Sequence, residues 1–189
     1  LDAMAEAAEA DGGAAQLDGP SGAPEGFRSG FVALVGRPNA GKSTLLNACY
    51  GKKVAITSPV AQTTRRRLRA VVNRPGCQLV IVDTPGLHKP KDGLGSELNK
   101  TALNELSDVD VIAFVIDASA PIGSGDAWVA ERVAAAKAPK VLVLTKADRA
   151  DQATVLRQLE SARALVDFDD EIVVSSTGGF NVEGFVGLV

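Results

Sequence analysis

Six short apolar runs, separated by longer amphipathic segments, constrain the fold of this chain more than any other feature. The runs predict strands near residues 31–35, 67–73, 78–82, 110–116, 140–144 and 171–174. The segments between them predict helices near residues 42–50, 94–107, 125–137 and 151–166, with a further helix from about residue 181. Strands that alternate with helices are typical of a sheet covered on both faces. We therefore expect an α/β fold, with a mostly parallel six-stranded sheet and helices on both faces.

Residues 1–29 differ in composition from the rest of the chain. They hold six acidic residues against Arg28 alone and few large apolar side chains. Such a segment cannot bury enough apolar surface to offset the entropy cost of ordering. We therefore expect a disordered acidic tail over residues 1–29 and one domain over residues 30–189. Without the tail, 19 basic residues face 17 acidic ones, a balance that does not favour an independent nucleic-acid-binding domain.

Two further observations bear on location. No apolar run approaches the roughly 18 residues needed to span a bilayer, and the acidic N-terminus lacks the basic start of a signal peptide. Cys49 and Cys77 have neither metal-site spacing nor the density of a disulfide scaffold, so we expect buried thiols. These observations predict a cytoplasmic protein without a transmembrane segment.

A phosphate-binding loop is predicted between the first strand and the first helix. It matches GxxxxGK[ST] and consists of Gly36, Arg37, Pro38, Asn39, Ala40, Gly41, Lys42 and Ser43, followed by Thr44. Glycines let backbone N–H groups surround a phosphate chain, the lysine neutralises the β- and γ-phosphates, and the Ser43 hydroxyl ligates Mg²⁺. The alternative, a glycine-rich turn that binds nothing, does not explain the strand and helix on either side. The sequence therefore predicts a P-loop NTPase that binds a nucleotide with Mg²⁺.

Two further motifs fit the γ-phosphate and the metal. Asp83, Thr84, Pro85 and Gly86 follow a buried strand, and Leu87 comes next. The carboxylate is placed to hold the Mg²⁺ shell, and the Gly86 N–H to approach the γ-phosphate.

The other motif comprises Gln62, Thr63 and Thr64. One of the two threonines should complete the Mg²⁺ site when a γ-phosphate is present. We favour Thr64, with Thr63 as the alternative.

The base is expected to be read at the ends of the last two strands. Thr145, Lys146, Ala147 and Asp148 follow one strand, and Ser175, Ser176 and Thr177 follow the other. A carboxylate at Asp148 can accept from guanine N1–H and the 2-amino group, whereas adenine offers neither donor. Lys146 should brace the phosphate loop, and the Ser176 N–H should contact guanine O6.

The order of these motifs resembles that of translation-factor-like GTPases. The segment from Asp83 to Leu103 is similar to the second switch region of the Era family, and residues 52–67 are similar to its first switch. The resemblance implies a P-loop NTPase G domain that binds GTP and GDP with Mg²⁺ and hydrolyses GTP. It also implies a role in small ribosomal subunit assembly and 16S rRNA maturation, through a C-terminal KH domain that this chain lacks. Peripheral association with the inner membrane is an open alternative for its location.

The resemblance also bears on catalysis. Leu87 stands where Ras-like GTPases place a water-orienting glutamine, so intrinsic hydrolysis should be slow. Several similar GTPases use K⁺ bound by a phosphate-loop asparagine, which here is Asn39. The alternative is that Asn39 only closes the loop. The residues expected to act in catalysis are Lys42, Thr64, Gly86 and Asn39.

Some positions depart from the family pattern or allow another reading. Thr145 replaces the usual asparagine, which should weaken bracing of the loop, and Ser176 replaces the usual alanine. Arg65, Arg66, Arg67 and Arg69 form a basic cluster that fits either a solvated strand edge or rRNA phosphates. His88 is expected to be a solvated loop residue. Two functional alternatives remain: an ATPase, and a module that binds a nucleotide without hydrolysing it.

Overall fold

The structure is a computed structural model, and the residues it describes are 26–50, 68–84, 87 and 106–189. The elements in chain order are β1 (Arg28–Val35), α1 (Lys42–Tyr50), β2 (Leu68–Arg74), β3 (Cys77–Asp83), β4 (Val111–Asp117), α3 (Ser124–Ala134), β5 (Lys140–Thr145), a 3-10 turn (Ala147–Arg149), α4 (Gln152–Arg163), β6 (Asp170–Val173) and α5 (Val182–Leu188). Each predicted strand is present, to within one residue at either end except at the start of β1, which begins three residues early. The helix predicted for residues 94–107 lies almost entirely outside the described residues.

The six strands form one sheet in the order β2-β3-β1-β4-β5-β6. Every neighbouring pair is parallel except β2 and β3, which are antiparallel. Only Pro75 and Gly76 connect those two strands, and a connection this short can join antiparallel strands only. The mostly parallel sheet predicted from the sequence is therefore confirmed, with its exception at the β2 edge.

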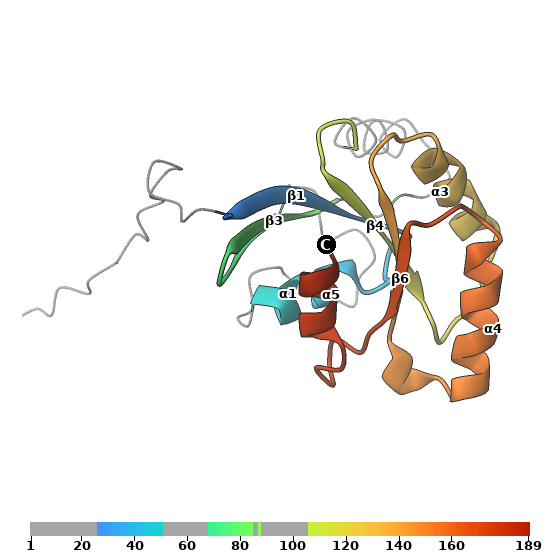
Figure 1. Cartoon of the computed structure of the whole chain (residues 1–189). Coiled ribbons are helices and arrows are strands. Elements are labelled where there is room, and N and C mark those ends of the chain that lie inside the picture. Colours follow the sequence, from blue (N-terminus) through green and yellow to red (C-terminus); the bar gives the residue numbers. More distant parts are fainter. Residues whose placement is uncertain (1–25, 51–67, 85–86, 88–105) are drawn as a thin grey trace, which may run out of the picture.

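Helices cover both faces of the sheet, as Figure 1 shows. Val32 and Leu34 of β1 belong to one apolar cluster, which α1 and α5 cover with side chains such as Leu45 and Phe185. Ala33 and Val35 belong to the other, where side chains of α3 and α4 pack. Successive side chains of a strand point to opposite faces, so residues 32–35 of β1 are buried on both sides and form a continuous apolar run.

The first strand begins earlier than the sequence predicted. Arg28 and Ser29 already pair with Cys77 and Gln78, so the domain starts two residues before the boundary expected at residue 30. Side chains at this end are exposed, and their polarity made the segment resemble the acidic tail. The rest of the expected tail, residues 1–25, lies outside the described residues.

Helix ends also shift. α3 ends at Ala134 instead of residue 137, and α4 spans Gln152–Arg163 instead of residues 151–166. Asp151 caps α4, because its side chain accepts from the Thr154 N–H at 2.6 Å. Within the described ranges, no helix is both long and apolar enough to cross a membrane.

Candidate nucleotide-binding site

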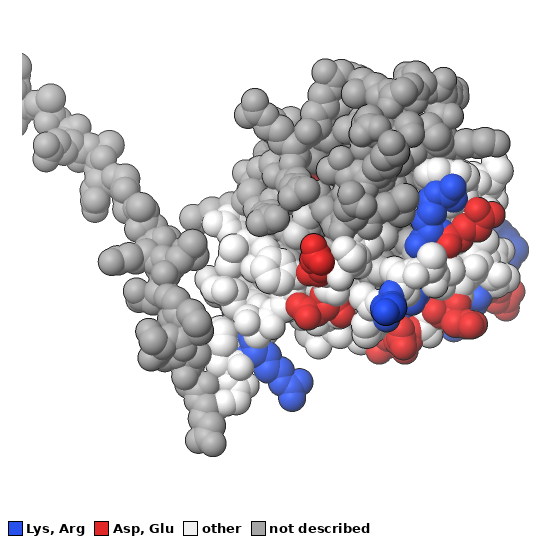
Figure 2. Space-filling view, turned by 90° about the horizontal axis from the view of Figure 1, so that it is seen from above, with Lys and Arg blue, Asp and Glu red and all other residues white. Residues whose placement is uncertain are grey.

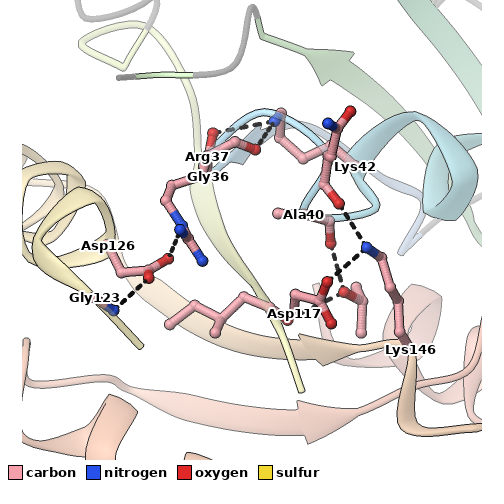
Figure 3. A network of polar contacts seen from close by, with 11 residues as sticks. Gly36, Arg37, Ala40, Lys42, Asp117, Gly123, Asp126 and Lys146 are labelled. Carbon is pink, nitrogen blue, oxygen red and sulfur yellow. Dashed lines mark hydrogen bonds and ion pairs between the residues drawn. The ribbon is translucent and has the colours of Figure 1, made fainter. Parts of the chain in front are cut away.

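The phosphate loop lies between the end of β1 and the start of α1, against the ends of β4 and β5 (Figure 3). A Cβ atom on Gly36 would lie 2.3 Å from the backbone oxygen of Val115 in β4. Gly41 has φ +98°, and a Cβ atom there would lie 3.1 Å from the hydroxyl oxygen of Thr145. Close packing against β4 explains the first glycine, and the left-handed backbone explains the second.

Lys42 is buried in this loop, with 6% of its surface exposed. Its ammonium group donates to the carbonyl oxygens of Gly36 at 3.1 Å and Arg37 at 2.8 Å. Burial lowers the pKa of Lys42 to about 8, although the charge of nearby Asp83 opposes that shift. Lys42 is thus a buried cation whose ammonium group is held by loop carbonyls. A bound anion would stabilise its positive charge.

The Ser43 hydroxyl donates to Oδ2 of Asp83 at the end of β3. Asp83 has no exposed surface, and its other oxygen, Oδ1, has no partner among the described residues. Burial raises the pKa of Asp83 against the opposing effects of the Ser43 hydrogen bond and the Lys42 charge. An unpaired buried carboxylate oxygen beside a serine hydroxyl matches the hard oxygen ligands that Mg²⁺ takes, so these two residues fit the metal.

The neighbours of Asp83 have structural roles in the sheet and the core. The Thr84 hydroxyl donates to the Leu34 carbonyl at 2.8 Å, which ties the end of β3 to β1. Leu87 is 1% exposed, and its side chain packs in the apolar cluster beneath α3. Its backbone N–H donates to the Gly36 carbonyl at 3.1 Å. Leu87 therefore reaches the phosphate loop through its backbone, while the Thr84 side chain bonds to β1.

The motif after β5 braces the phosphate loop from the other side. The buried Thr145 hydroxyl lies 2.5 Å from the Ala40 carbonyl and 3.1 Å from the Ile116 carbonyl, and its one hydrogen serves both. The Lys146 ammonium donates to the Asn39 carbonyl at 2.7 Å. Thr145 is therefore a direct brace for the loop, although it replaces an amide with a hydroxyl.

Asp117, at the end of β4, holds Lys146 in place. Its Oδ2 accepts from the Lys146 ammonium at 2.6 Å, and its Oδ1 accepts from both the N–H and the hydroxyl of Ser119. Burial alone would raise the pKa of Asp117, but these hydrogen bonds lower it below its usual value. The carboxylate is therefore ionised at neutral pH and fixes the direction of the lysine (Figure 3).

Asp148 lies exposed after the braced lysine, facing the loop that follows β6. Its Oδ1 accepts from the Ser175 hydroxyl at 2.6 Å, and its Oδ2 lies 3.3 Å from the Thr177 hydroxyl. The Ser175 bond is the main cause of the lowered pKa of Asp148. The lowered pKa means that the carboxylate is ionised, and its two hydrogen bonds orient it. Each oxygen keeps a free lone pair and can accept from one further donor.

Comparisons with known proteins assign the chain to a family. The family model described as 50S ribosome-binding GTPase matches residues 31–146. The chain belongs to this GTPase family. It is 46% identical over 169 residues to the GTPase Era of Corynebacterium glutamicum, covering 88% of this chain and 55% of the relative. It is 41% identical over 162 residues to the GTPase Era of Staphylococcus epidermidis, covering 86% and 54%.

A solved structure supports the same assignment for the described residues. Era in complex with MgGDPNP and nucleotides of 16S ribosomal RNA superposes with a TM-score of 0.80 at 34% identity, covering 86% of this chain and 56% of that one. The described residues thus form a G domain of the Era type. The chain spans about half the length of the curated relatives it matches.

Several predicted site residues of this G domain lie outside the described residues. They are Gln62, Thr63, Thr64, Pro85 and Gly86, together with Arg65, Arg66, Arg67 and His88. Asn39 is described: it is exposed and has φ +64°, and the structure uses its carbonyl oxygen to hold Lys146. The roles predicted for these residues stay predictions.

Sequence reasoning missed two acidic residues of the G domain site. Asp117 is the first polar residue after the apolar run of β4, as Thr145 is after that of β5, and this shared position could have been noticed in the sequence. Asp126 contacts the phosphate loop from the first turn of α3, through Arg37, which is 89 residues away in sequence. No local pattern indicates that second contact.

The surface of the described part is mixed in charge. On the face shown in Figure 2, acidic and basic side chains lie among one another. Among the described residues, ion pairs such as Arg163 with Glu171 and Arg74 with Glu183 also bring opposite charges together. This distribution agrees with the nearly balanced charge of residues 30–189 and does not resemble a strongly basic nucleic-acid-binding face.

Proposed function

We propose that this G domain binds GTP and GDP with Mg²⁺ and hydrolyses GTP slowly, as a switch. One connected network carries the proposal. Lys42 and the Ser43–Asp83 pair stand at its phosphate end, and Asp148 stands at its base end. Thr145 and Lys146 link the two ends through the Ala40 and Asn39 carbonyls. A nucleotide needs the phosphate site and the base site at a fixed distance from each other. The hydrogen bonds from Thr145 and Lys146 to the backbone of the phosphate loop fix that distance.

Guanine specificity follows from the state of Asp148. Its ionised carboxylate can accept from guanine N1–H and the 2-amino group, while Ser175 and Thr177 keep it oriented. Adenine would leave those lone pairs facing no donor, which costs binding energy. The Ser176 N–H is our choice for the contact to guanine O6.

The residues that would hold Mg²⁺ are Ser43 and Asp83, with Thr64 added when GTP is bound. The ion would neutralise charge on the β- and γ-phosphates. Lys42 contributes a second positive charge from inside the loop. The Gly86 N–H is predicted from the sequence to contact the γ-phosphate. Leu87 has a buried side chain, so orientation of the attacking water must come from another group. Asn39, with a bound K⁺, is the proposed charge-stabilising group.

The role of the whole protein is inferred from its relatives. Era binds 16S ribosomal RNA in the solved complex, and this chain matches about half the length of that protein. We propose that the full-length protein acts in small ribosomal subunit assembly and 16S rRNA maturation, with a KH domain as its RNA-binding half. A cytoplasmic location, expected from the composition of the sequence, and peripheral association with the inner membrane are further predictions.

Two measurements test the proposal. Excess GTP should displace labelled GDP, and excess ATP should not; displacement by ATP to the same extent would exclude guanine specificity. Purified protein with GTP and Mg²⁺ should release phosphate slowly, and EDTA should stop the release. Tight GTP binding without any phosphate release would favour a nucleotide-binding module without turnover.

A further inference from the structure

One buried acidic residue lies outside every nucleotide motif. Six polar or charged residues are buried in the described part of the chain, and five of them, Lys42, Asp83, Thr84, Thr145 and Ser175, belong to the motifs. The sixth is Asp126, in the first turn of α3, with 1% of its surface exposed. A carboxylate is rarely buried without a partner that stabilises its charge, so its contacts indicate its role.

Both oxygens of Asp126 are paired. Oδ1 accepts from Nε of Arg37 at 2.7 Å, and Oδ2 accepts from the N–H of Gly123 at 3.0 Å. The Gly123 bond caps the start of α3. The Arg37 bond has no function in capping, because it joins α3 to a residue of the phosphate loop (Figure 3).

The Arg37 side chain lies directly across the start of α3. A Cβ atom added to Gly125 would lie 2.8 Å from Cδ of Arg37. The Arg37 side chain cannot move aside freely, because the ion pair with Asp126 holds its far end. Glycine at position 125 therefore leaves the space that the Arg37 side chain occupies.

The backbone of Arg37 belongs to the part of the loop that holds the phosphate-binding lysine. Its carbonyl oxygen accepts from the Lys42 ammonium at 2.8 Å and from the Ala40 N–H at 3.3 Å. The same residue is thus fixed to α3 by its side chain and to Lys42 by its carbonyl. A shift of the side chain would move the carbonyl that positions the lysine.

We infer that Asp126 is a positioning residue for nucleotide binding, which acts through Arg37 on the phosphate loop and does not touch the nucleotide. The inference rests on the proposed nucleotide binding and adds a component from α3 to it. It assigns Arg37 a different role from direct phosphate contact: its guanidinium anchors the loop to α3. Loss of either charge should loosen the loop and weaken binding.

The first test is a double-mutant cycle on GDP affinity. Asp126→Asn keeps an acceptor for the Gly123 N–H but loses the charge that holds Arg37, and Arg37→Gln loses the guanidinium. Each single variant should weaken GDP binding on the order of tenfold, the lower end for loss of an outer-shell partner. The double variant should bind no more weakly than the weaker single one, because both changes break one contact. Additive losses, or unchanged affinity in Asp126→Asn, would overturn the inference.

A second variant keeps both charged residues, and it remains informative if Asp126→Asn does not fold. In Gly125→Ala the gain in helix propensity opposes the cost of displacing the Arg37 side chain, so the melting temperature should fall by less than in Asp126→Asn. It displaces Arg37, so GDP binding should still weaken by about the same factor. Wild-type affinity in this variant would contradict the inference.

Glu131→Gln is the matched control, since it removes an exposed carboxylate from the same helix. Among the described contacts, this carboxylate pairs only with Arg132. Its GDP affinity should equal that of the wild type. A wild-type chain that binds no GDP would refute the proposed function itself. Binding by the wild type together with unaffected variants would refute only the role of Asp126.

Discussion

Ser43 at the start of α1 and Asp83 at the end of β3 are joined by a hydrogen bond that leaves Oδ1 of Asp83 buried and without a partner among the described residues. The bond crosses 40 residues of sequence and brings the phosphate loop to the end of a parallel strand. Burying a carboxylate oxygen without a donor or a cation is unfavourable. A divalent cation would remove this cost, so the pair is prepared for a metal.

Removing the Ser43 hydroxyl should remove the effect of Mg²⁺ on nucleotide binding. In the wild type, we expect GDP to dissociate about tenfold more slowly with Mg²⁺ than with EDTA, the size typical of a ligand that supports a metal site. In Ser43→Ala the two rates should converge. Ser43→Thr keeps a hydroxyl and should behave as the wild type. An undiminished Mg²⁺ effect in Ser43→Ala, measured by release of fluorescent GDP, would show that Ser43 is not a metal ligand.

Asp148→Asn should change base preference. The amide presents a donor toward the 2-position, which suits xanthine and opposes guanine, so GTP affinity should fall at least about tenfold through loss of a charge-assisted contact. Xanthosine triphosphate should bind better than GTP in competition assays. Asp151→Asn, which alters the nearby cap of α4, should leave both affinities unchanged. Equal GTP affinity in Asp148→Asn and the wild type would exclude Asp148 as the base reader.

Nucleotide affinity should decrease above the pKa of Lys42. Without nucleotide this pKa is about 8, because burial lowers it. Above pH 8 the nucleotide-free lysine loses its proton, and phosphate binding must restore it. GDP binding should therefore take up a proton near pH 8, as measured by calorimetry in buffers of different ionisation enthalpy. Lys42→Arg stays charged and should show no uptake. Wild-type binding without proton uptake at pH 8 would contradict the lowered pKa.

The same pKa predicts the opposite trend for folding stability. The unfolded chain binds this proton up to its ordinary pKa of 10.5, whereas the folded nucleotide-free chain releases it near 8. Between these values the unfolded state carries more protons, so the contribution of Lys42 to the free energy of unfolding rises with pH. Between pH 8 and 10.5, Lys42 therefore makes the fold more stable as the pH rises. A loss of GDP affinity in this range cannot result from unfolding caused by Lys42.

Asn39 is predicted to support stimulation of hydrolysis by K⁺. Phosphate release should be faster in K⁺ than in Na⁺ at equal ionic strength. The residue has φ +64°, so alanine would strain the backbone, and Asn39→Gly is the better test because glycine adopts this conformation. The K⁺ effect should disappear in Asn39→Gly and persist in Asn39→Asp, which keeps a side-chain oxygen. Equal rates in the two salts for the wild type would rule out this role.

Thr145→Val should loosen the phosphate loop while keeping the shape of the side chain. It removes the hydroxyl that lies 2.5 Å from the Ala40 carbonyl, and the free energy of unfolding should fall by about 1–2 kcal/mol. GDP affinity should fall as well, because the loop and the guanine motif lose a link. Thr145→Ser keeps the hydroxyl and should retain affinity. Denaturant titration with wild-type stability in Thr145→Val would show that the contact contributes little.

Much of the fold was predictable because its signals are local. β1, β4 and β5 are buried on both faces, so each is a nearly continuous apolar run that ends where a polar motif begins. Phosphate-loop chemistry needs residue types at set spacings along one short segment. The start of β1 was missed because its first residues are polar and exposed, and polarity alone does not distinguish a solvated strand end from a tail.

The sequence alone determined the order of the described strands and helices along the chain, the position of the phosphate loop and the family, while the metal and base roles of its other motifs stay predictions. Only the tertiary structure decided which distant groups hold those motifs in place. The Arg37–Asp126 pair spans 89 residues and the Lys146–Asp117 pair spans 29, and the side chain of Leu87 turns into the core. Such contacts depend on how strands and helices pack against one another, and packing brings together residues whose separation in the sequence carries no periodic signal.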